Sequence, residues 1–269
     1  MKKDMVTICV VNYKTLDLTR LCLRSIRKYT DYPHQVLVID NNSKDSSTEY
    51  LKSLNWIQFA NRTDKNNDAS GGYAHGAALD MGLAMCDTEY FMAMHSDTFV
   101  YQTGWLTELM RYFHDIPALA CVGGGKCRLT PAWRQWLKKA TDFTTFKRKL
   151  LGVPDPLGKY RYYNRTVCSI YHTEVLKKEN LTFLMDREKG LTVGKKLYFE
   201  LVDRGYPTVE LSDQTMKRYL WHLEHATQVV NADEYNLQNR TIRKINRLMD
   251  KMMHSEQVRQ IMADESLDR

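Results

Sequence analysis

Apolar runs alternate with amphipathic stretches along the first 125 residues of the chain. The run Val-Thr-Ile-Cys-Val-Val at 6–11 is apolar or β-branched throughout, which is typical of a strand buried on both faces. Further strands are predicted at 35–39, 56–59, 90–94 and 119–122. Helical spacing of apolar residues predicts helices at 16–26, 46–53, 73–86 and 105–114. Because strands and helices alternate, the sequence predicts an α/β fold with a mostly parallel central sheet flanked by helices.

The rest of the chain has a less regular pattern. Strands are predicted at 166–171 and 208–211, and short helices at 173–178 and 195–204. One long C-terminal helix is predicted at 233–262, because its apolar residues recur on a single stripe. The stripe consists of Leu237, Ile242, Ile245, Leu248, Met249, Met252, Val258 and Ile261. Such a helix is also a candidate surface for a homodimer.

Composition narrows the class of protein. The chain has 269 residues, of which 43% are hydrophobic and 26% charged, as in ordinary globular proteins. Its longest apolar runs fall far short of the roughly 20 residues that span a bilayer. The six cysteines form no CxxC pair and no signal-peptide pattern precedes the first strand, so we expect free thiols in a reducing cytoplasm.

The net charge of +7 is concentrated in one segment. Residues 126–165 carry 11 Lys or Arg and 2 Asp, a net of +9, whereas the residues before and after are close to neutral. This distribution argues against a nucleic-acid-binding protein and for one local basic surface. Trp133 and Trp136 are interleaved with the basic residues, which suits a helix at the surface of an anionic membrane. A lid packed on the acceptor site, with solvated charges, remains the alternative.

Polar clusters follow three of the predicted strands: Asn12-Tyr13, Asp40–Ser43 and His95-Ser96-Asp97. In parallel sheets the carboxyl ends of the strands form the ligand crevice, so we expect the three clusters to meet. The second cluster suits hydrogen bonds to a base or ribose, or an Asx-type turn that starts the next helix. The third suits a divalent cation, with imidazole favouring Mn²⁺ over Mg²⁺, or the capping of a following helix.

Other motifs exclude several enzyme classes. No GK[ST] follows a glycine-rich loop, no GxGxxG follows the first strand, and neither GxSxG nor HExxH occurs. These absences argue against a P-loop nucleotidase, a nicotinamide-dependent enzyme, an α/β-hydrolase and a zinc protease. His222-Leu-Glu-His225 has the spacing of a metal-ligand pair, but residues three apart share a helix face without any metal.

Taken in order, these motifs resemble family 2 glycosyltransferases with the GT-A fold, including a rhamnosyltransferase-like branch. The matching pieces are TICVVNY at 7–13, VIDNNS at 38–43, the loop and small-residue helix around Gly71-Gly72, and MHSDT at 94–98. The resemblance is good over about residues 5–125 and looser through 166–227.

The resemblance implies a domain organisation. Residues 1–227 would form a single GT-A catalytic domain, and residues 228–269 a C-terminal helical extension. Within the catalytic domain, 1–125 would bind the nucleotide sugar, 126–165 would be a basic amphipathic insertion, and 166–227 would form the acceptor half.

The resemblance also implies residues for binding the donor. Val11, Asn12 and Tyr13 would line the base pocket, with Asp40 on the base and Asn42 nearby. The pair Gly71 and Gly72 would let the chain approach the sugar nucleotide closely.

The position of the family's DxD motif is taken by His95, Ser96 and Asp97. Asp97 would be the metal-binding carboxylate, while His95 and Ser96 would lie against the nucleotide sugar. His222 occupies the place of a histidine near the end of the catalytic domain, where it would complete the metal shell or bind the diphosphate.

The catalytic base departs from the family pattern. Many relatives carry an acidic pair where this chain has Val193 and Gly194. Asp186 and Glu188 are the nearest acidic residues upstream, and they are either the base or solvated loop charges.

The resemblance implies a metal-dependent, inverting glycosyltransferase that uses Mn²⁺ or Mg²⁺. It would move a hexose or deoxyhexose from a nucleoside-diphosphate sugar to a glycan or lipid-linked acceptor, in polysaccharide or glycoconjugate synthesis. We expect it in the cytoplasm, with peripheral contact at the inner face of the membrane through 126–165. Two alternatives stay open: a sugar-nucleotide nucleotidyltransferase, and a non-catalytic protein that binds a sugar nucleotide.

Overall fold

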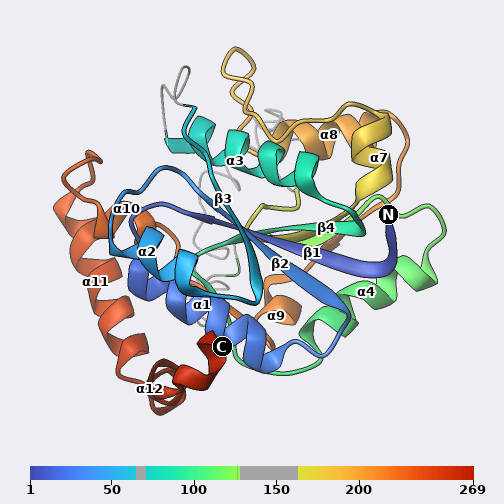
Figure 1. Ribbon diagram of the computed structural model, residues 1–269. Helices are drawn as coiled ribbons and strands as arrows, with labels where there is room; N and C mark the ends of the chain where they lie inside the picture. Colours follow the sequence, from blue (N-terminus) through green and yellow to red (C-terminus); the bar gives the residue numbers. More distant parts are fainter. Residues whose placement is uncertain (65–70, 126, 128–162) are drawn as a thin grey trace, which may run out of the picture.

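A seven-stranded sheet in the order β3-β2-β1-β4-β7-β6-β8 forms the centre of the fold (Figure 1). The computed structural model describes residues 1–64, 71–125, 127 and 163–269. The strands are β1 (Lys2–Asn12), β2 (His34–Asp40), β3 (Ile57–Asn61), β4 (Thr88–His95), β6 (Cys121–Gly124), β7 (Cys168–His172) and β8 (Thr208–Leu211). Only β7 runs antiparallel to its neighbours within this sheet, so the predicted mostly parallel sheet is confirmed.

Helices cover both faces of the sheet (Figure 1). On one face lie α1 (Leu16–Tyr29), α2 (Ser46–Ser53) and α4 (Trp105–Asp115); on the other lie α3 (Gly71–Met85), α7 (Thr173–Lys178) and α8 (Lys195–Asp203). Strand β1 therefore sends alternate residues into two cores. Val6, Ile8 and Val10 belong to the first core, and Cys9 and Val11 to the second. The prediction of a strand buried on both faces is confirmed.

A second, two-stranded sheet joins distant parts of the sequence. Strand β5 (Thr98–Val100) directly follows β4, and it pairs antiparallel with β9 (Leu220–His222). Between β8 and β9 lies the short helix α9 (Asp213–Met216). Three-residue strands are too short for a periodic pattern, so neither β5 nor β9 was predicted.

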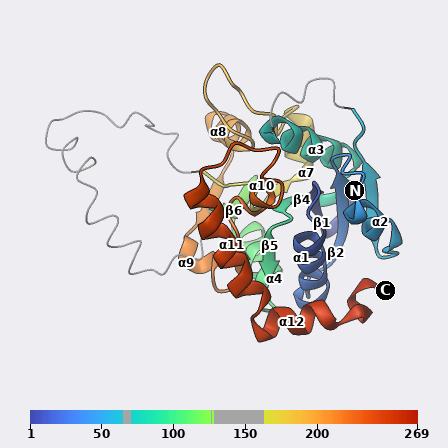
Figure 2. The same ribbon diagram turned by 90° about the vertical axis from the view of Figure 1, so that its left-hand side faces the viewer.

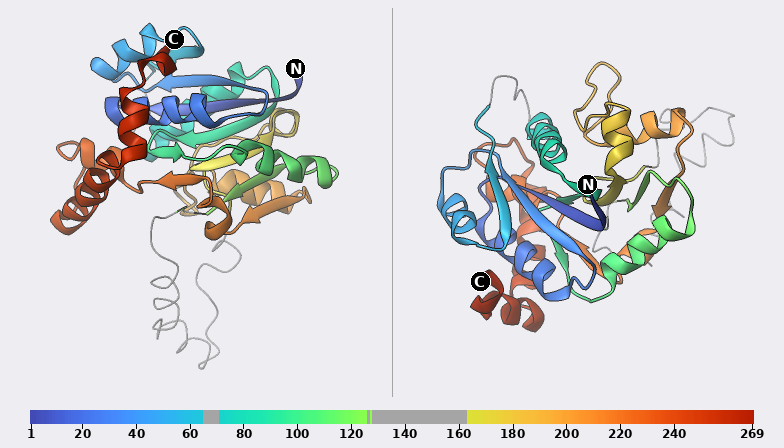
Figure 3. Two further views of the ribbon diagram at one scale, coloured as in Figure 1. Left: turned by 90° about the horizontal axis from the view of Figure 1, so that it is seen from below. Right: turned by 45° about the vertical axis from the view of Figure 1, so that its right-hand side comes forward.

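The prediction of one long C-terminal helix is wrong. Residues 233–262 contain two helices, α11 (Asn239–Met253) and α12 (Glu256–Ala263), instead of one. The short helix α10 (Ala226–Val230) precedes them, and the 3₁₀ helix η2 (Glu265–Asp268) follows. The side chain of Ser255 caps α12 by accepting a hydrogen bond from the backbone of Val258, which starts a new helix after α11 ends. These helices lie on the opposite side of the molecule from the N-terminus (Figures 1 and 3).

The apolar stripe of this segment packs on the chain's own core. Ile245, Met252, Val258 and Ile261 are buried there, and the remaining stripe residues pack against the same core. Most of the apolar surface of the stripe is therefore covered within one chain. A homodimer through this stripe stays a prediction.

None of the helices in the described part of the chain is long and apolar enough to cross a bilayer. All six cysteines are buried as free thiols, as the scattered cysteine pattern predicts.

Candidate functional site

The register of the sheet brings the predicted clusters to one edge. Asn12 pairs with Asp40 across β1 and β2, and Val11 pairs with His95 across β1 and β4. Because β1, β2 and β4 are parallel, these residues lie together at the carboxyl ends of the strands, where α/β sheets bind ligands.

The β5–β9 ladder places His222 beside Asp97. It sets Thr98 opposite His222, and the backbone N–H of Leu223 donates to the carbonyl of Asp97 at 3.0 Å. The Nε2 atom of His222 consequently lies 3.3 Å from Oδ1 of Asp97, and each side chain is only 5% exposed. A buried carboxylate and a buried imidazole from distant parts of the sequence thus share one site.

His95 completes a cluster of three potential metal ligands. Its Nδ1 lies 3.7 Å from Oδ1 of Asp97, and the ligand atoms of His95, Asp97 and His222 all lie within 4.8 Å of one another. One carboxylate and two imidazoles form a donor set that Mn²⁺ accepts, whereas Mg²⁺ prefers oxygen ligands. The three residues therefore fit a divalent cation at the carboxyl end of β4.

The charge state of Asp97 suits this role. Burial alone would raise the pKa of the Asp97 carboxyl, but the charge and hydrogen bond of His222, together with His95, lower that pKa below its usual value. The carboxyl is therefore ionised at neutral pH, which is the form that binds a metal.

Thr166 orients the ring of His95. Its Oγ1 lies 3.1 Å from Nε2 of His95, so the ring presents Nδ1 to Asp97. Hydrogen bonds of this kind from the outer nitrogen fix the ring of metal-binding histidines. Burial and the neighbouring His75 hold the pKa of His95 well below its usual value.

Gly194 leaves room for Thr166. Its φ is +69°, and a Cβ at this position would lie 2.6 Å from Cγ2 of Thr166. A side chain at residue 194, where the resemblance expects an acidic residue, would therefore displace the partner of His95. The absence of an acidic side chain at residue 194 therefore coincides with the close contact between Gly194 and Thr166.

His75 is a site residue that sequence reasoning missed. Its ring, on the second turn of α3, stands edge-to-face with that of His95 at a centroid distance of 4.7 Å. Its Nε2 is buried and has no hydrogen-bond partner. Burial lowers the pKa of His75 to about 4, so the imidazole is neutral at neutral pH. No sequence signal marks it, because a single His among small helical residues fits no motif.

Asp40 and Asn12 form a buried network rather than an open surface. The Asp40 carboxylate accepts hydrogen bonds from Asn12 Nδ2 at 2.7 Å, Thr48 Oγ1 at 3.0 Å and the backbone of Ser43 at 3.1 Å. The Asn12 amide oxygen accepts from Thr19 at 2.7 Å. Both Asp40 and Asn12 are 0% exposed, so their first role is to fix the turn after β2. A contact between Asp40 and a base stays a prediction.

Asn42, unlike Asp40, has a side-chain oxygen without a hydrogen-bond partner. It adopts a left-handed φ of +60°, and its Oδ1 is buried without a partner. An acceptor of this kind at the carboxyl end of β2 suits a donor group on a ligand.

A segment after α10 lies over the end of β1. Glu234 pairs with Lys14 and accepts a hydrogen bond from the hydroxyl of Tyr13 at 2.5 Å. The hydroxyl of Tyr235 packs so closely on Gly71 that a Cβ there would lie 2.9 Å from it. Tyr13 and Gly71, both predicted to bind the donor, thus contact a segment that no motif connects to them. Gly72 follows in the first turn of α3.

The remaining predicted residues stay untested. Ser96 is buried beside the cluster. Asp186 forms an isolated bridge with Leu191, and its carboxylate accepts from the backbone of Lys189 at 3.0 Å. Glu188 is exposed in the same turn. His225, the alternative to His222, is exposed and caps α10 in a left-handed conformation. The basic segment, including Trp133 and Trp136, lies outside the described residues except for Cys127 and 163–165.

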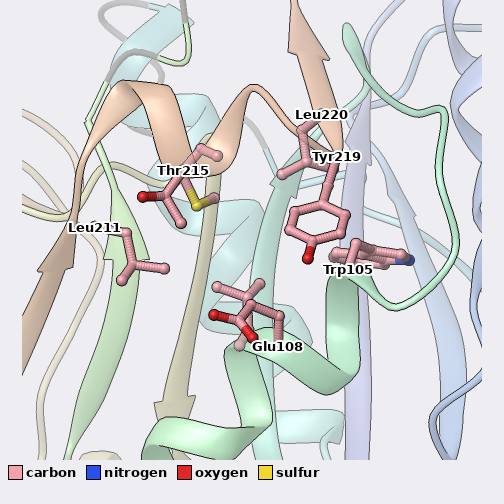
Figure 4. A pocket seen from close by; sticks show the side chains of 8 residues that line it. Trp105, Glu108, Leu211, Thr215, Tyr219 and Leu220 are labelled. Atoms are coloured by element: carbon pink, nitrogen blue, oxygen red, sulfur yellow. The ribbon is translucent and has the colours of Figure 1, made fainter.

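One small pocket lies away from these residues, between α4 and the chain around α9 and β9 (Figure 4). It is lined by Trp105, Glu108, Leu109, Leu211, Thr215, Met216, Tyr219 and Leu220. None of the predicted site residues lines it, so the pocket does not bear on the cluster.

The sequence model described as glycosyl transferase family 2 matches residues 7–170, which is more than half of the chain. The chain belongs to glycosyl transferase family 2. The matched region contains the second half of β1, all of β2 and the turn with His95 and Asp97, whereas β9 with His222 lies beyond it.

Similar proteins agree with this membership. The O-antigen chain rhamnosyltransferase RfbN of Salmonella typhimurium is 26% identical over 120 residues, which are 44% of this chain and 36% of that protein. The match therefore spans only about a third of the length of this curated relative.

Two solved structures share the fold. The mannosyltransferase PcManGT of Pyrobaculum calidifontis, in complex with GDP-Man and Mn²⁺, aligns at a TM-score of 0.55 with 14% identity, over 96% of this chain and 73% of its own. TarS of S. aureus, residues 1–349 in complex with UDP-GlcNAc, aligns at a TM-score of 0.54 with 16% identity, over 98% and 71%. These similarities confirm the α/β architecture expected of a family 2 glycosyltransferase.

Proposed function

We propose that this family 2 member transfers a sugar from a nucleoside-diphosphate sugar to a hydroxyl acceptor. The observation that carries the proposal is the cluster of His95, Asp97 and His222 at the carboxyl end of β4, in which Asp97 and His222 are buried and His95 is half-buried. The activities named for RfbN and PcManGT, and the UDP-GlcNAc bound in the TarS complex, support the same class of reaction. Residues 1–227 would form the catalytic domain, with 228–269 as its helical extension.

A divalent cation held by Asp97, His222 and His95 would supply positive charge next to the diphosphate leaving group. The Mn²⁺ in the PcManGT complex supports this assignment, and the two imidazoles favour Mn²⁺ over Mg²⁺. His75 would lie on the diphosphate side of the cluster, where a ligand group could become the partner that its buried Nε2 lacks.

The nucleotide would lie along the ends of β1 and β2. Tyr13, Asn42 and the turn fixed by Asp40 would line its base and ribose, while Gly71 and Gly72 would adjoin the sugar. The unpartnered Oδ1 of Asn42 supports this placement. The rhamnosyltransferase activity of RfbN makes a deoxyhexose donor the first to test, and GDP- and UDP-sugars follow from the two structures.

The reaction would proceed by inversion, with a carboxylate that accepts the proton of the attacking hydroxyl. Asp186 and Glu188 are the candidates for that base, because Gly194 leaves no space for an acidic side chain. The acceptor would be a hydroxyl of a glycan or of a lipid-linked glycan. Six free buried thiols support a cytoplasmic site of action.

Incubation of the purified protein with dTDP-, GDP- and UDP-sugars, with Mn²⁺ or with a chelator, tests the proposal. We expect release of the nucleoside diphosphate from one donor, dependent on Mn²⁺ and increased by an acceptor glycan. Binding without release from any donor would indicate a non-catalytic sugar-nucleotide-binding protein. Release of pyrophosphate from a nucleoside triphosphate and a sugar phosphate would indicate a nucleotidyltransferase.

A further inference from the structure

Helix α11 carries a continuous row of basic side chains. All five of its Lys and Arg residues are exposed: Arg240, Arg243, Lys244, Arg247 and Lys251. At about 100° per residue, these positions fall within an arc of about 100° on the helix surface. At a rise of about 1.5 Å per residue, the row is about 17 Å long. The helix therefore presents one straight, strongly positive face.

The opposite face of α11 is fixed in the core. Ile245 and Met252 are buried, and Ile242, Leu248 and Met249 pack against the same core. The basic row is consequently held in place by packing rather than by its own contacts. Helix α11 lies on the outside of the fold, at the left border in Figure 1 and toward the viewer in Figure 2, and all five basic side chains are exposed.

No acidic partner among the described residues neutralises the row. None of the five basic side chains forms an ion pair or a hydrogen bond with the residues that the structure describes. The single acidic residue of α11, Asp250, lies at the margin of the arc and pairs with His254 at 3.2 Å. The residues from 166 onward carry 16 basic and 16 acidic side chains, so this local excess does not follow from composition.

The segment that leads into α11 contacts the candidate site. The segment between α10 and α11 contains Glu234 and Tyr235, which contact Tyr13, Lys14 and Gly71 at the end of β1. Val230, at the end of α10, is 46% exposed and is one of few large apolar residues at the surface of the described chain. A flat partner bound to the basic row would therefore lie beside the edge of the sheet that carries the site.

We propose that the basic face of α11 binds the surface of an anionic lipid bilayer. A straight row of cations on a rigid helix matches a plane of negative headgroups, and each Lys or Arg near such a surface adds to the attraction. Because the apolar face of α11 is already buried, the contact is electrostatic and sensitive to salt. This surface consists of residues other than those of the segment 126–165, and the inference does not depend on the proposed reaction.

A nucleic acid fits the same face less well. Helix α11 contains no aromatic residue on which bases could stack. Its row is straight, whereas the phosphates of a duplex follow the helical grooves. Binding to duplex DNA is therefore an outcome for the experiment to exclude.

Co-sedimentation of the full chain with lipid vesicles tests the inference. The vesicles consist of phosphatidylcholine alone, or of equal amounts of phosphatidylcholine and phosphatidylglycerol. The variant Arg240→Gln/Arg243→Gln/Arg247→Gln removes three charges from the row. The control Lys3→Gln/Lys52→Gln/Lys178→Gln removes the same charge from exposed residues of β1, α2 and α7. Circular dichroism verifies that both variants fold, which we expect because every changed side chain is exposed.

We expect the wild type and the control to sediment only with the anionic vesicles, and to be released at high salt. The α11 variant should bind at least about tenfold more weakly, given the contribution of each cation. The inference is wrong if the wild type does not bind, if the α11 variant binds as the wild type does, or if the control loses as much affinity. It is also wrong if the row binds duplex DNA more tightly than the anionic vesicles.

Discussion

His222 and Asp97 form a buried pair across the β5–β9 ladder, with Nε2 of His222 lying 3.3 Å from Oδ1 of Asp97. The ladder has only three residue pairs, yet it sets the position of a side chain far along the sequence. Because β5 directly follows the turn with Asp97, the same backbone pairing that closes the fold also assembles the candidate metal site.

The two histidines of the HLEH motif should behave differently. His222→Ala removes a buried imidazole that contacts Asp97, so we expect affinity for Mn²⁺ with a nucleoside diphosphate to fall at least about tenfold. His225→Ala changes an exposed side chain and should leave that affinity unchanged. Isothermal titration calorimetry of both folded variants measures the difference. Equal affinity of His222→Ala and the wild type would remove His222 from the site.

Gly194→Ala tests the packing that holds His95. We expect a loss of stability, and a loss of Mn²⁺ affinity of about 10- to 100-fold, because the new Cβ displaces the hydrogen-bond partner of His95. Gly205→Ala is the matched control: Gly205 also has a positive φ, of +80°, but no atom lies within 4 Å of its added Cβ. The control should cost only the backbone strain, about 1–2 kcal/mol. Similar metal affinity in both variants would show that Thr166 does not orient the site.

The base is tested by Asp186→Asn and Glu188→Gln, made separately. One of them should lower kcat by about 10²- to 10⁴-fold with little change in donor affinity, since a base acts in the transition state. Single-turnover kinetics together with donor titrations separate the two effects. If neither variant changes kcat, the base lies elsewhere in the chain.

Asp268, next to the C-terminal residue, contacts Arg24 and Tyr50, and this contact should make the free energy of unfolding depend on pH. Burial alone would raise the pKa of Asp268, but hydrogen bonds from Arg24 and Tyr50 and the charge of Arg24 lower it overall. A carboxyl whose pKa is lower in the folded state stabilises the fold above its unfolded pKa, and this stabilisation disappears as pH falls through the folded pKa. Asp268→Asn should therefore cost about 1–2 kcal/mol at pH 7 and little at strongly acidic pH. Urea denaturation at both pH values measures this, and an equal cost at both would contradict it.

The sequence predicted the parts of the fold that have strong periodicity. The β-branched run at 6–11, the amphipathic helix at 16–26 and the helix at 46–53 are all observed, because burial on one or two faces leaves a clear pattern. The C-terminal helix was wrong because its apolar stripe continues across residues 254 and 255, whereas the serine cap starts a new helix with the same core-facing period.

The candidate site was only partly predictable, for a similar reason. Asp97 and Asp40 stand at the ends of strands, which the pattern locates, so their shared edge could be inferred. Contacts such as His75 with His95, Gly194 with Thr166 and Glu234 with Lys14 depend on tertiary packing between distant segments. No local pattern of residues specifies them.

Calorimetric titration of GDP, UDP and dTDP into the wild type and Asp97→Asn, with and without Mn²⁺, tests the metal-dependent donor site most directly. Asp97 is a buried, ionised member of the cluster, so its neutral analogue should keep the fold but lose Mn²⁺-dependent binding. Asp115→Asn, on the exposed end of α4, is the control and should bind as the wild type does. We predict that at least one nucleoside diphosphate binds the wild type with an affinity that Mn²⁺ raises, and that Asp97→Asn abolishes this increase. Mn²⁺-dependent binding of equal strength in Asp97→Asn and the wild type would contradict the proposed site.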